Sequence, residues 1–144
     1  PPIFDEDYEF DPHKARIITE GSDVTLVTTG LTTQLALVAV NSLHQDGLQI
    51  EHIHYPSVKP FDVNTLVESV KKTGVVVTAE NQNVIGGLGG AVCEVLADNY
   101  PAKVKRLGAQ DRFGEVGDVP YLSETLGFSA AKIADACREM KNAR

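Results

Sequence analysis

The chain has 144 residues, of which 42% are hydrophobic and 23% are charged, and its formal net charge is −7. These values are ordinary for a soluble globular protein, and the length corresponds to one domain. An acidic chain has no electrostatic attraction to polyanions, so the charge argues against nucleic acid and acidic membranes as partners.

The apolar pattern and the cysteine content predict a cytoplasmic protein. No apolar stretch approaches the roughly 20 residues that a membrane-spanning helix needs. The N-terminal residues are acidic, whereas a signal peptide has basic and then apolar residues. Cys93 and Cys137 lie far apart in the sequence, each within an amphipathic helical pattern. Cysteines in this arrangement, without a second pair for zinc, are typical of reduced thiols in a core.

Residues 1–13 are predicted to form a linker or arm ahead of a domain that spans residues 14–144. Phe4, Tyr8 and Phe10 are interspersed with acidic residues in this segment. Three aromatic side chains in so short a stretch indicate docking on a neighbouring surface. The acidic composition is equally compatible with a disordered tail.

From residue 14 onward, strand and helix patterns alternate. Short apolar runs predict the strands, and apolar residues three and four apart predict the helices. The predicted order is strand 15–19, strand 24–28, helix 33–45, strand 49–55, a helix between the N-cap Asp62 and the C-terminal Gly74, strand 74–79, helix 91–98, strand 103–107, a loop over 108–120, and a helix capped by Ser129. Strands that alternate with helices imply parallel crossovers and a three-layer α/β/α sandwich.

The most distinctive run joins the strand at 74–79 to the next helix through four glycines, namely Gly86, Gly87, Gly89 and Gly90. Glycines after a buried strand allow a sharp turn and close packing of the helix on the sheet. A helix start also attracts anions, but the glycine spacing matches neither the dinucleotide fingerprint nor the phosphate loop. The run therefore predicts a structural turn, with an anion site as the alternative.

Two further sets of polar residues are candidates for chemistry. Glu80 ends the central strand at the edge where α/β proteins usually bind ligands, which makes it the best candidate for a positioned carboxylate. Alternatively, Glu80 hydrogen-bonds the turn backbone or a partner subunit. His52 and His54 share one face of a strand, so a metal could use both. No other ligand is placed by the sequence, which favours a structural role, and no nucleophile motif is present.

The predicted loop at 108–120 holds a candidate interface. Arg112 and Phe113 are adjacent in it, and an arginine beside an exposed aromatic residue resembles an interface anchor. Phe113 could equally fold back onto its own core.

Four motifs, in this order, carry a resemblance to a known family: the runs at 21–30, 59–62, 78–89 and 110–117, which read GSDVTLVTTG, KPFD, TAENQNVIGGLG and QDRFGEVG. Together they resemble the C-terminal domain of transketolases, in particular the C-terminal subunit of the split bacterial and archaeal type. The resemblance covers nearly the whole chain, from about Tyr8 to Met140. Related domains occur in deoxyxylulose-phosphate synthase and in the β subunits of 2-oxo-acid dehydrogenases.

The resemblance implies a five-stranded sheet whose short first strand is antiparallel to the other four. It also implies part of a thiamine-diphosphate enzyme of the pentose phosphate pathway that moves a two-carbon ketol unit between sugar phosphates. In that family, thiamine diphosphate and Mg²⁺ are bound by the preceding pyrophosphate- and pyrimidine-binding domains. The C-terminal domain helps to build the homodimer, so the resemblance implies no catalytic, cofactor-binding or metal-binding residue in this chain.

One departure and two alternatives accompany this interpretation. Many relatives carry a histidine where this chain has Gln82. Glutamine does not titrate near neutral pH, so any role of that histidine is lost or altered. The alternatives are the corresponding domain of another thiamine-diphosphate enzyme and a free-standing regulatory module that binds an anion at the helix start near 86–90.

Overall fold

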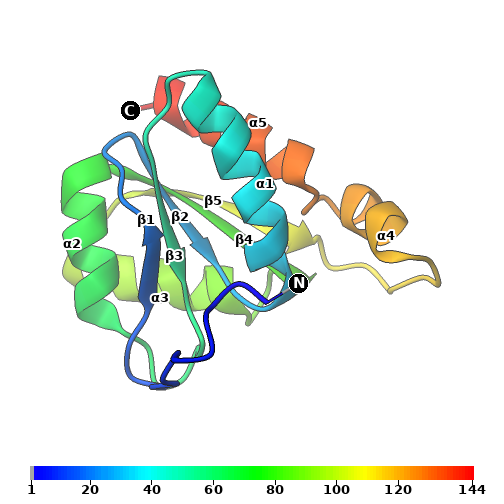
Figure 1. The fold of residues 1–144 in the computed structure, drawn as a ribbon, viewed down its shortest axis with the longest axis horizontal. Coiled ribbons are helices and arrows are strands. Elements are labelled where there is room, and N and C mark those ends of the chain that lie inside the picture. The colour runs from blue at the N-terminus through cyan, green and yellow to red at the C-terminus, as the bar shows by residue number, and fades with distance from the viewer. Residues whose placement is uncertain (1) are drawn as a thin grey trace.

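The computed structural model describes residues 2–144, which form a five-stranded sheet between two layers of helices (Figure 1). The strands are β1 (Arg16–Thr19), β2 (Val24–Thr28), β3 (Ile50–His54), β4 (Val75–Asn83) and β5 (Lys103–Ala109). Their order in the sheet is β1-β3-β2-β4-β5. β1 is antiparallel to β3, and the other pairs are parallel. The predicted three-layer fold with an antiparallel first strand is therefore confirmed.

Four helices cover the two faces of the sheet. α1 (Leu31–Gln45) and α5 (Ala130–Asn142) pack together on one face, and α2 (Val63–Thr73) and α3 (Leu88–Asn99) cover the other. A short helix, α4 (Val119–Thr125), extends beyond the layers (Figure 1). Among the residues that the structure describes, no helix is long and apolar enough to cross a membrane.

Two apolar cores result, one on each face of the sheet. Every residue of β2 is buried, because both faces of this central strand are covered. Val24 and Leu26 belong to the core with α1 and α5, whereas Val27 belongs to the core with α2 and α3. The buried hydroxyl of Thr25, on the α2 side, lies 2.6 Å from the hydroxyls of both Ser69 and Thr73, so its burial leaves no unpaired polar atom.

The helix ends on which the prediction and the structure agree are those set by a capping side chain or by a glycine. Asp62 accepts a hydrogen bond from the backbone N–H of Thr65 at the start of α2 (3.1 Å). Gly74 ends α2 with φ of 79°, a conformation that costs glycine little. Ser129 caps α5 by accepting from the N–H of Lys132 (3.3 Å).

The differences from the prediction that change an element most are three. β4 continues to Asn83 instead of ending near residue 79, because Asn83 still pairs with Ala109 of β5. α3 begins at Leu88 instead of near residue 91. Residues 119–125, partly assigned to a loop, form α4, because the Asp118 side chain caps the N–H of Tyr121 (2.9 Å).

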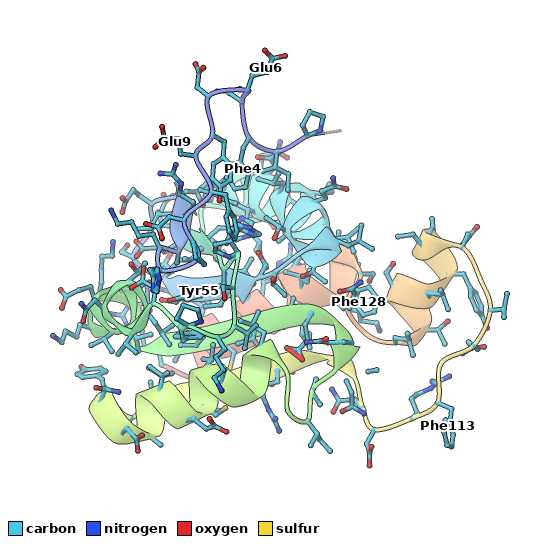
Figure 2. The ribbon with its side chains drawn as sticks, turned by 90° about the horizontal axis from the view of Figure 1, so that it is seen from below. Phe4, Glu6, Glu9, Tyr55, Phe113 and Phe128 are labelled. Atoms are coloured by element: carbon cyan, nitrogen blue, oxygen red, sulfur yellow. The ribbon has the colours of Figure 1, made fainter. Side chains whose placement is uncertain are left out.

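The described part of the N-terminal arm lies against the domain. The ring of Phe4 stacks on Tyr8 at 4.3 Å between centroids and contacts His54 at 5.4 Å. The guanidinium of Arg16 lies 5.0 Å from the centroid of the Tyr8 ring. Figure 2 shows Phe4 pointing toward the domain while Glu6 lies at the outer tip of the arm. These contacts support docking rather than a disordered tail.

Candidate functional site

Glu80 is a fully buried residue of β4, and its side chain reaches the start of α3. Its Oε2 atom accepts a hydrogen bond from the backbone N–H of Gly89 at 2.8 Å. Burial raises the pKa of the Glu80 carboxyl, while hydrogen bonds from the Gly89 and Leu88 backbones and the charge of Arg106 act against the rise. A carboxylate from the preceding strand therefore takes the place of an N-cap side chain, because amides at a helix N-terminus favour negative charge.

Three of the four glycines near Glu80 lie where a side chain would clash or would strain the backbone. A methyl group on Gly87 would overlap the Glu80 carboxylate and approach the Asn83 carbonyl oxygen to 2.9 Å. Gly86 has φ of 78°, which few other residues adopt. A methyl group on Gly89 would lie 2.8 Å from Cδ of Arg106, whereas Gly90 faces open space.

This arrangement bears on the anion site predicted for the glycine turn. The Gly89 amide donates to Glu80, and the carboxylate places negative charge beside any incoming anion. Oε1 of Glu80 and Oγ1 of Thr78 are buried without a hydrogen-bond partner among the described residues. Both atoms lie on the α3 side of β4. The nearby cation, Arg106, donates to the Val84 carbonyl at 3.1 Å, so an external anion here stays a prediction.

His52 and His54 belong to a chain of four hydrogen-bonding side chains on the α1 side of the sheet. His52 Nε2 is 2.8 Å from the Thr28 hydroxyl, and that hydroxyl is 3.0 Å from the Thr33 hydroxyl. The Thr33 hydroxyl is 2.9 Å from His54 Nδ1. The geometry gives both histidines a structural role that joins β2, β3 and α1.

One unpaired atom decides the direction of the hydrogen bond between His52 and Thr28. Nδ1 of His52 is buried without a partner among the described residues, and an orphaned N–H costs more than an unused acceptor. His52 therefore carries its proton on Nε2 and donates to Thr28. Burial lowers the pKa of His52 to about 4, helped by the nearby His54, whose own pKa burial also lowers. Within the part of the chain that the structure describes, no cluster of three or more His, Cys, Asp or Glu could hold a metal.

At the edge of the sheet where such folds usually bind ligands, threonine hydroxyls hydrogen-bond the backbone of the chain itself. β2 and β4 are neighbours, and the helices that follow them cover opposite faces of the sheet. Open α/β sheets bind ligands in the crevice at such a point. Here the Thr32 hydroxyl lies 2.7 Å from the carbonyl oxygens of both Thr29 and Ala79. The Thr29 hydroxyl donates to the Tyr55 carbonyl at 2.8 Å, so threonine hydroxyls engage the backbone at this crevice.

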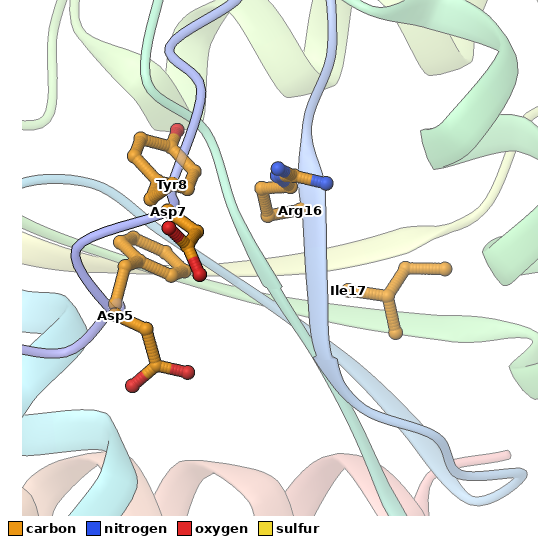
Figure 3. Close-up of a pocket in the computed structure, with 6 residues that line it drawn as sticks. Asp5, Asp7, Tyr8, Arg16 and Ile17 are labelled. Carbon is orange, nitrogen blue, oxygen red and sulfur yellow. The ribbon is translucent and has the colours of Figure 1, made fainter.

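A shallow pocket of about 320 Å³ lies between the arm and β1 (Figure 3). Its lining includes Asp5, Asp7, Tyr8, Arg16 and Ile17. The single guanidinium is already engaged with the Tyr8 ring, and the carboxylates belong to the exposed arm. No sequence pattern indicates this pocket, since its residues come together only when the arm docks.

The predicted interface residues lie in the segment that leads to α4. Phe113 is 98% exposed and projects away from the domain (Figure 2). Arg112 points back within the segment, because its Nη2 atom lies 2.6 Å from Oε1 of Glu115. Val116, which the sequence analysis did not single out, is also fully exposed. A lone valine between polar and glycine residues carries no periodic signal that would mark it.

A family model of the transketolase C-terminal domain matches residues 13–133. The chain is 44% identical over 138 residues to the 6-deoxy-6-sulfo-D-fructose transketolase subunit SqwH of Clostridium sp. (strain MSTE9), covering 96% of this chain and 43% of that protein. It is 41% identical over 122 residues to 1-deoxy-D-xylulose-5-phosphate synthase 1 of Geobacter sulfurreducens, covering 83% of this chain and 19% of that protein. The chain thus spans less than half the length of these relatives.

Solved structures agree with the sequence relatives. A split gene transketolase, described as an inactive beta4 tetramer, superposes with a TM-score of 0.93 at 40% identity, covering 99% of this chain and 46% of that one. A transketolase from Pichia stipitis shares the fold, with a TM-score of 0.65 at 17% identity over 91% of this chain and 18% of that one. The family model and the sequence relatives cover most of the chain, and it belongs to the family of transketolase C-terminal domains.

Proposed function

We propose that this chain is the non-catalytic C-terminal section of a thiamine-diphosphate-dependent transketolase, which transfers a two-carbon ketol unit between sugar phosphates. The observation that carries the proposal is the share of each relative that the chain matches. Nearly the whole chain matches the sulfofructose transketolase subunit and the split gene transketolase, yet it spans less than half of each. The rest of the enzyme's machinery then lies in sequence that these 144 residues do not contain.

Thiamine diphosphate and Mg²⁺ would be bound by the preceding pyrophosphate- and pyrimidine-binding domains or subunit. The feature of this chain that most resembles a diphosphate site is the start of α3, and it does not fit that group. Glu80 accepts the N–H of Gly89 there, and its carboxylate would repel a diphosphate. No step of the reaction is therefore assigned to residues of this chain.

The chain would act by assembly. The preceding domains or subunit are its proposed partner, within an enzyme that forms a homodimer, and the segment that holds Arg112 and Phe113 is the proposed interface. The structural relative at 40% identity is described as an inactive beta4 tetramer. That description supports a chain that associates with other chains and depends on a further component for activity.

A domain of deoxyxylulose-phosphate synthase is the second candidate, because the Geobacter enzyme is 41% identical over 122 residues. The match covers less of this chain than the transketolase subunit does, 83% against 96%, which favours the transketolase.

The test is the reaction of the complete enzyme with different substrates. Ketol transfer from xylulose 5-phosphate to ribose 5-phosphate is expected, and 6-deoxy-6-sulfofructose should be tried as an alternative ketol donor. Formation of 1-deoxy-D-xylulose 5-phosphate without ketol transfer would replace the proposal with the second candidate.

A further inference from the structure

The segment between β5 and α5 stands apart from both apolar cores. Residues 110–121 run from the end of β5 to the middle of α4 and lie outside the layers of the domain (Figures 1 and 2). Of the large hydrophobic side chains that are exposed in the described chain, four gather here: Phe113 at 98%, Val116 at 101%, Val119 at 45% and Tyr121 at 49%. Exposed apolar groups that gather in one segment mark an interaction surface more often than single ones do.

Internal contacts hold the segment in one conformation. The Glu115 carboxylate is bridged, since Oε1 pairs with Arg112 at 2.6 Å and Oε2 accepts from the Tyr121 hydroxyl at 2.8 Å. Gly117 packs so closely on the Tyr121 ring that a methyl group there would overlap it. A segment that is already ordered loses less conformational entropy when it binds. Phe113 and Val116 are therefore presented outward before any partner arrives.

The charges of the segment indicate what kind of surface it fits. Residues 110–121 contain three acidic residues and one basic residue, namely Asp111, Glu115, Asp118 and Arg112. Arg112 is paired with Glu115, so the unpaired charge around the apolar side chains is negative. Two copies of this surface would repel each other, whereas an apolar pocket with basic residues at its rim would complement it.

Resting on the proposed function, we infer that Phe113 and Val116 are the anchor by which this chain docks into an apolar, basic-rimmed pocket on the thiamine-binding portion of the same enzyme. Arg112 and Glu115 act indirectly, by fixing the shape of the segment. Arg112 is thus a positioning residue rather than a contact residue, because its guanidinium is paired with Glu115 of the same segment.

The test compares association of this chain with the thiamine-binding portion, measured by isothermal titration calorimetry, for wild type and a Phe113→Ser, Val116→Ser double variant. At least a tenfold rise in Kd is expected, since buried aromatic anchors dominate interface energies. The circular dichroism and thermal unfolding of the variant should match wild type, because both side chains are exposed. Val38→Ser, which alters an exposed apolar residue on α1, is the control and should leave Kd unchanged.

Glu115→Gln tests the positioning role. It should raise Kd a few-fold alone and add little to the Phe113→Ser, Val116→Ser variant, because a looser segment matters only through the anchor it presents. Association should also weaken as salt rises from 0.05 to 0.5 M, if the rim is basic.

Three results would overturn the inference. One is a double variant that binds as tightly as wild type while the wild-type complex is active, which would leave the proposed function standing. Another is self-association of the chain alone that depends on Phe113, which would make a second copy the partner. The last is a wild-type chain that does not bind a folded, active thiamine-binding portion, which would remove the proposed function as well.

Discussion

At the scale of single residues, most buried polar side chains in the described part of the chain are hydrogen-bonded by other side chains or by the backbone. His52 is the sharpest case, because it is fully buried and, among the described residues, its imidazole is hydrogen-bonded to the Thr28 hydroxyl alone. A charged imidazole there would lose hydration without gaining a carboxylate partner. The neutral ring is therefore the form that the fold selects.

This selection makes folding stability depend on pH. The pKa of His52 falls from 6.5 to about 4 on folding, so only the unfolded chain takes up the proton between those values. The contribution is complete above pH 6.5 and is lost as pH falls toward 4, amounting to roughly 3 kcal/mol. Urea unfolding at pH 7.5 and 4.5 should show the loss, and His52→Gln should make it smaller. A variant at exposed His13 serves as the control, and an unchanged pH dependence in His52→Gln would refute the assignment.

The two thiols should differ in reactivity. Burial raises the pKa of Cys137 to about 12, and the thiolate is the reactive form. Cys93 is only partly buried, so the expectation that both are core thiols holds fully for Cys137 alone. A thiol reagent should modify one cysteine per folded chain, with Cys93→Ser abolishing that reaction and Cys137 reacting only in denaturant. Rapid modification of both thiols in the folded protein would contradict this.

At the scale of elements, the junction of β4 and α3 depends on the fit between Glu80 and Gly87. Gly87→Ala should destabilise the protein by about 1–3 kcal/mol, because its methyl group would overlap the buried carboxylate. Glu80→Ala should cost about 1–2 kcal/mol through the lost cap. Chemical denaturation of both single variants and the double variant should give a total smaller than the sum, because removing Glu80 relieves part of the overlap. Gly90→Ala, where space is open, is the matched control, and full additivity would show that the two residues do not interact.

The same junction shows why some elements were predictable and others were not. Helix ends set by a local signal, such as Asp62 or Ser129, agree with the sequence prediction. The start of α3 was placed too late because its cap comes from Glu80, nine residues before Gly89 and in another element. β4 was ended too early because Asn83 is held by a partner in β5. Contacts between segments distant in sequence leave no periodic pattern to detect.

The residues of the candidate site were likewise predictable only in part. The order of the four motifs was enough to identify the family, whereas the sequence left Phe113 open between an exposed anchor and a residue packed on its own core. The ion pair that turns Arg112 toward Glu115 was not foreseen, and neither was the exposed Val116. The hydroxyl chain between His52 and His54 depends on Thr28 and Thr33, which no spacing rule connects to a histidine.

At the scale of the whole molecule, the chain is a two-core domain with an ordered segment that projects from it. The two cores account for the stability of the sheet and helices, and neither needs residues 110–121 to bury its apolar side chains. The chain's own threonines and Glu80 engage the polar groups where such folds often bind ligands. We propose that the domain contributes to an enzyme through its surface, which includes the exposed Phe113 and Val116.

We propose that this domain completes an enzyme whose catalytic residues lie in another domain or subunit. The most direct measurement is ketol transfer from xylulose 5-phosphate to ribose 5-phosphate by the folded thiamine-binding portion, titrated with this chain. We expect little ketol transfer without the chain, and a rise in activity that saturates at one chain per thiamine-binding portion. Full activity without the chain, or no response to its addition by a portion that is otherwise competent, would contradict it.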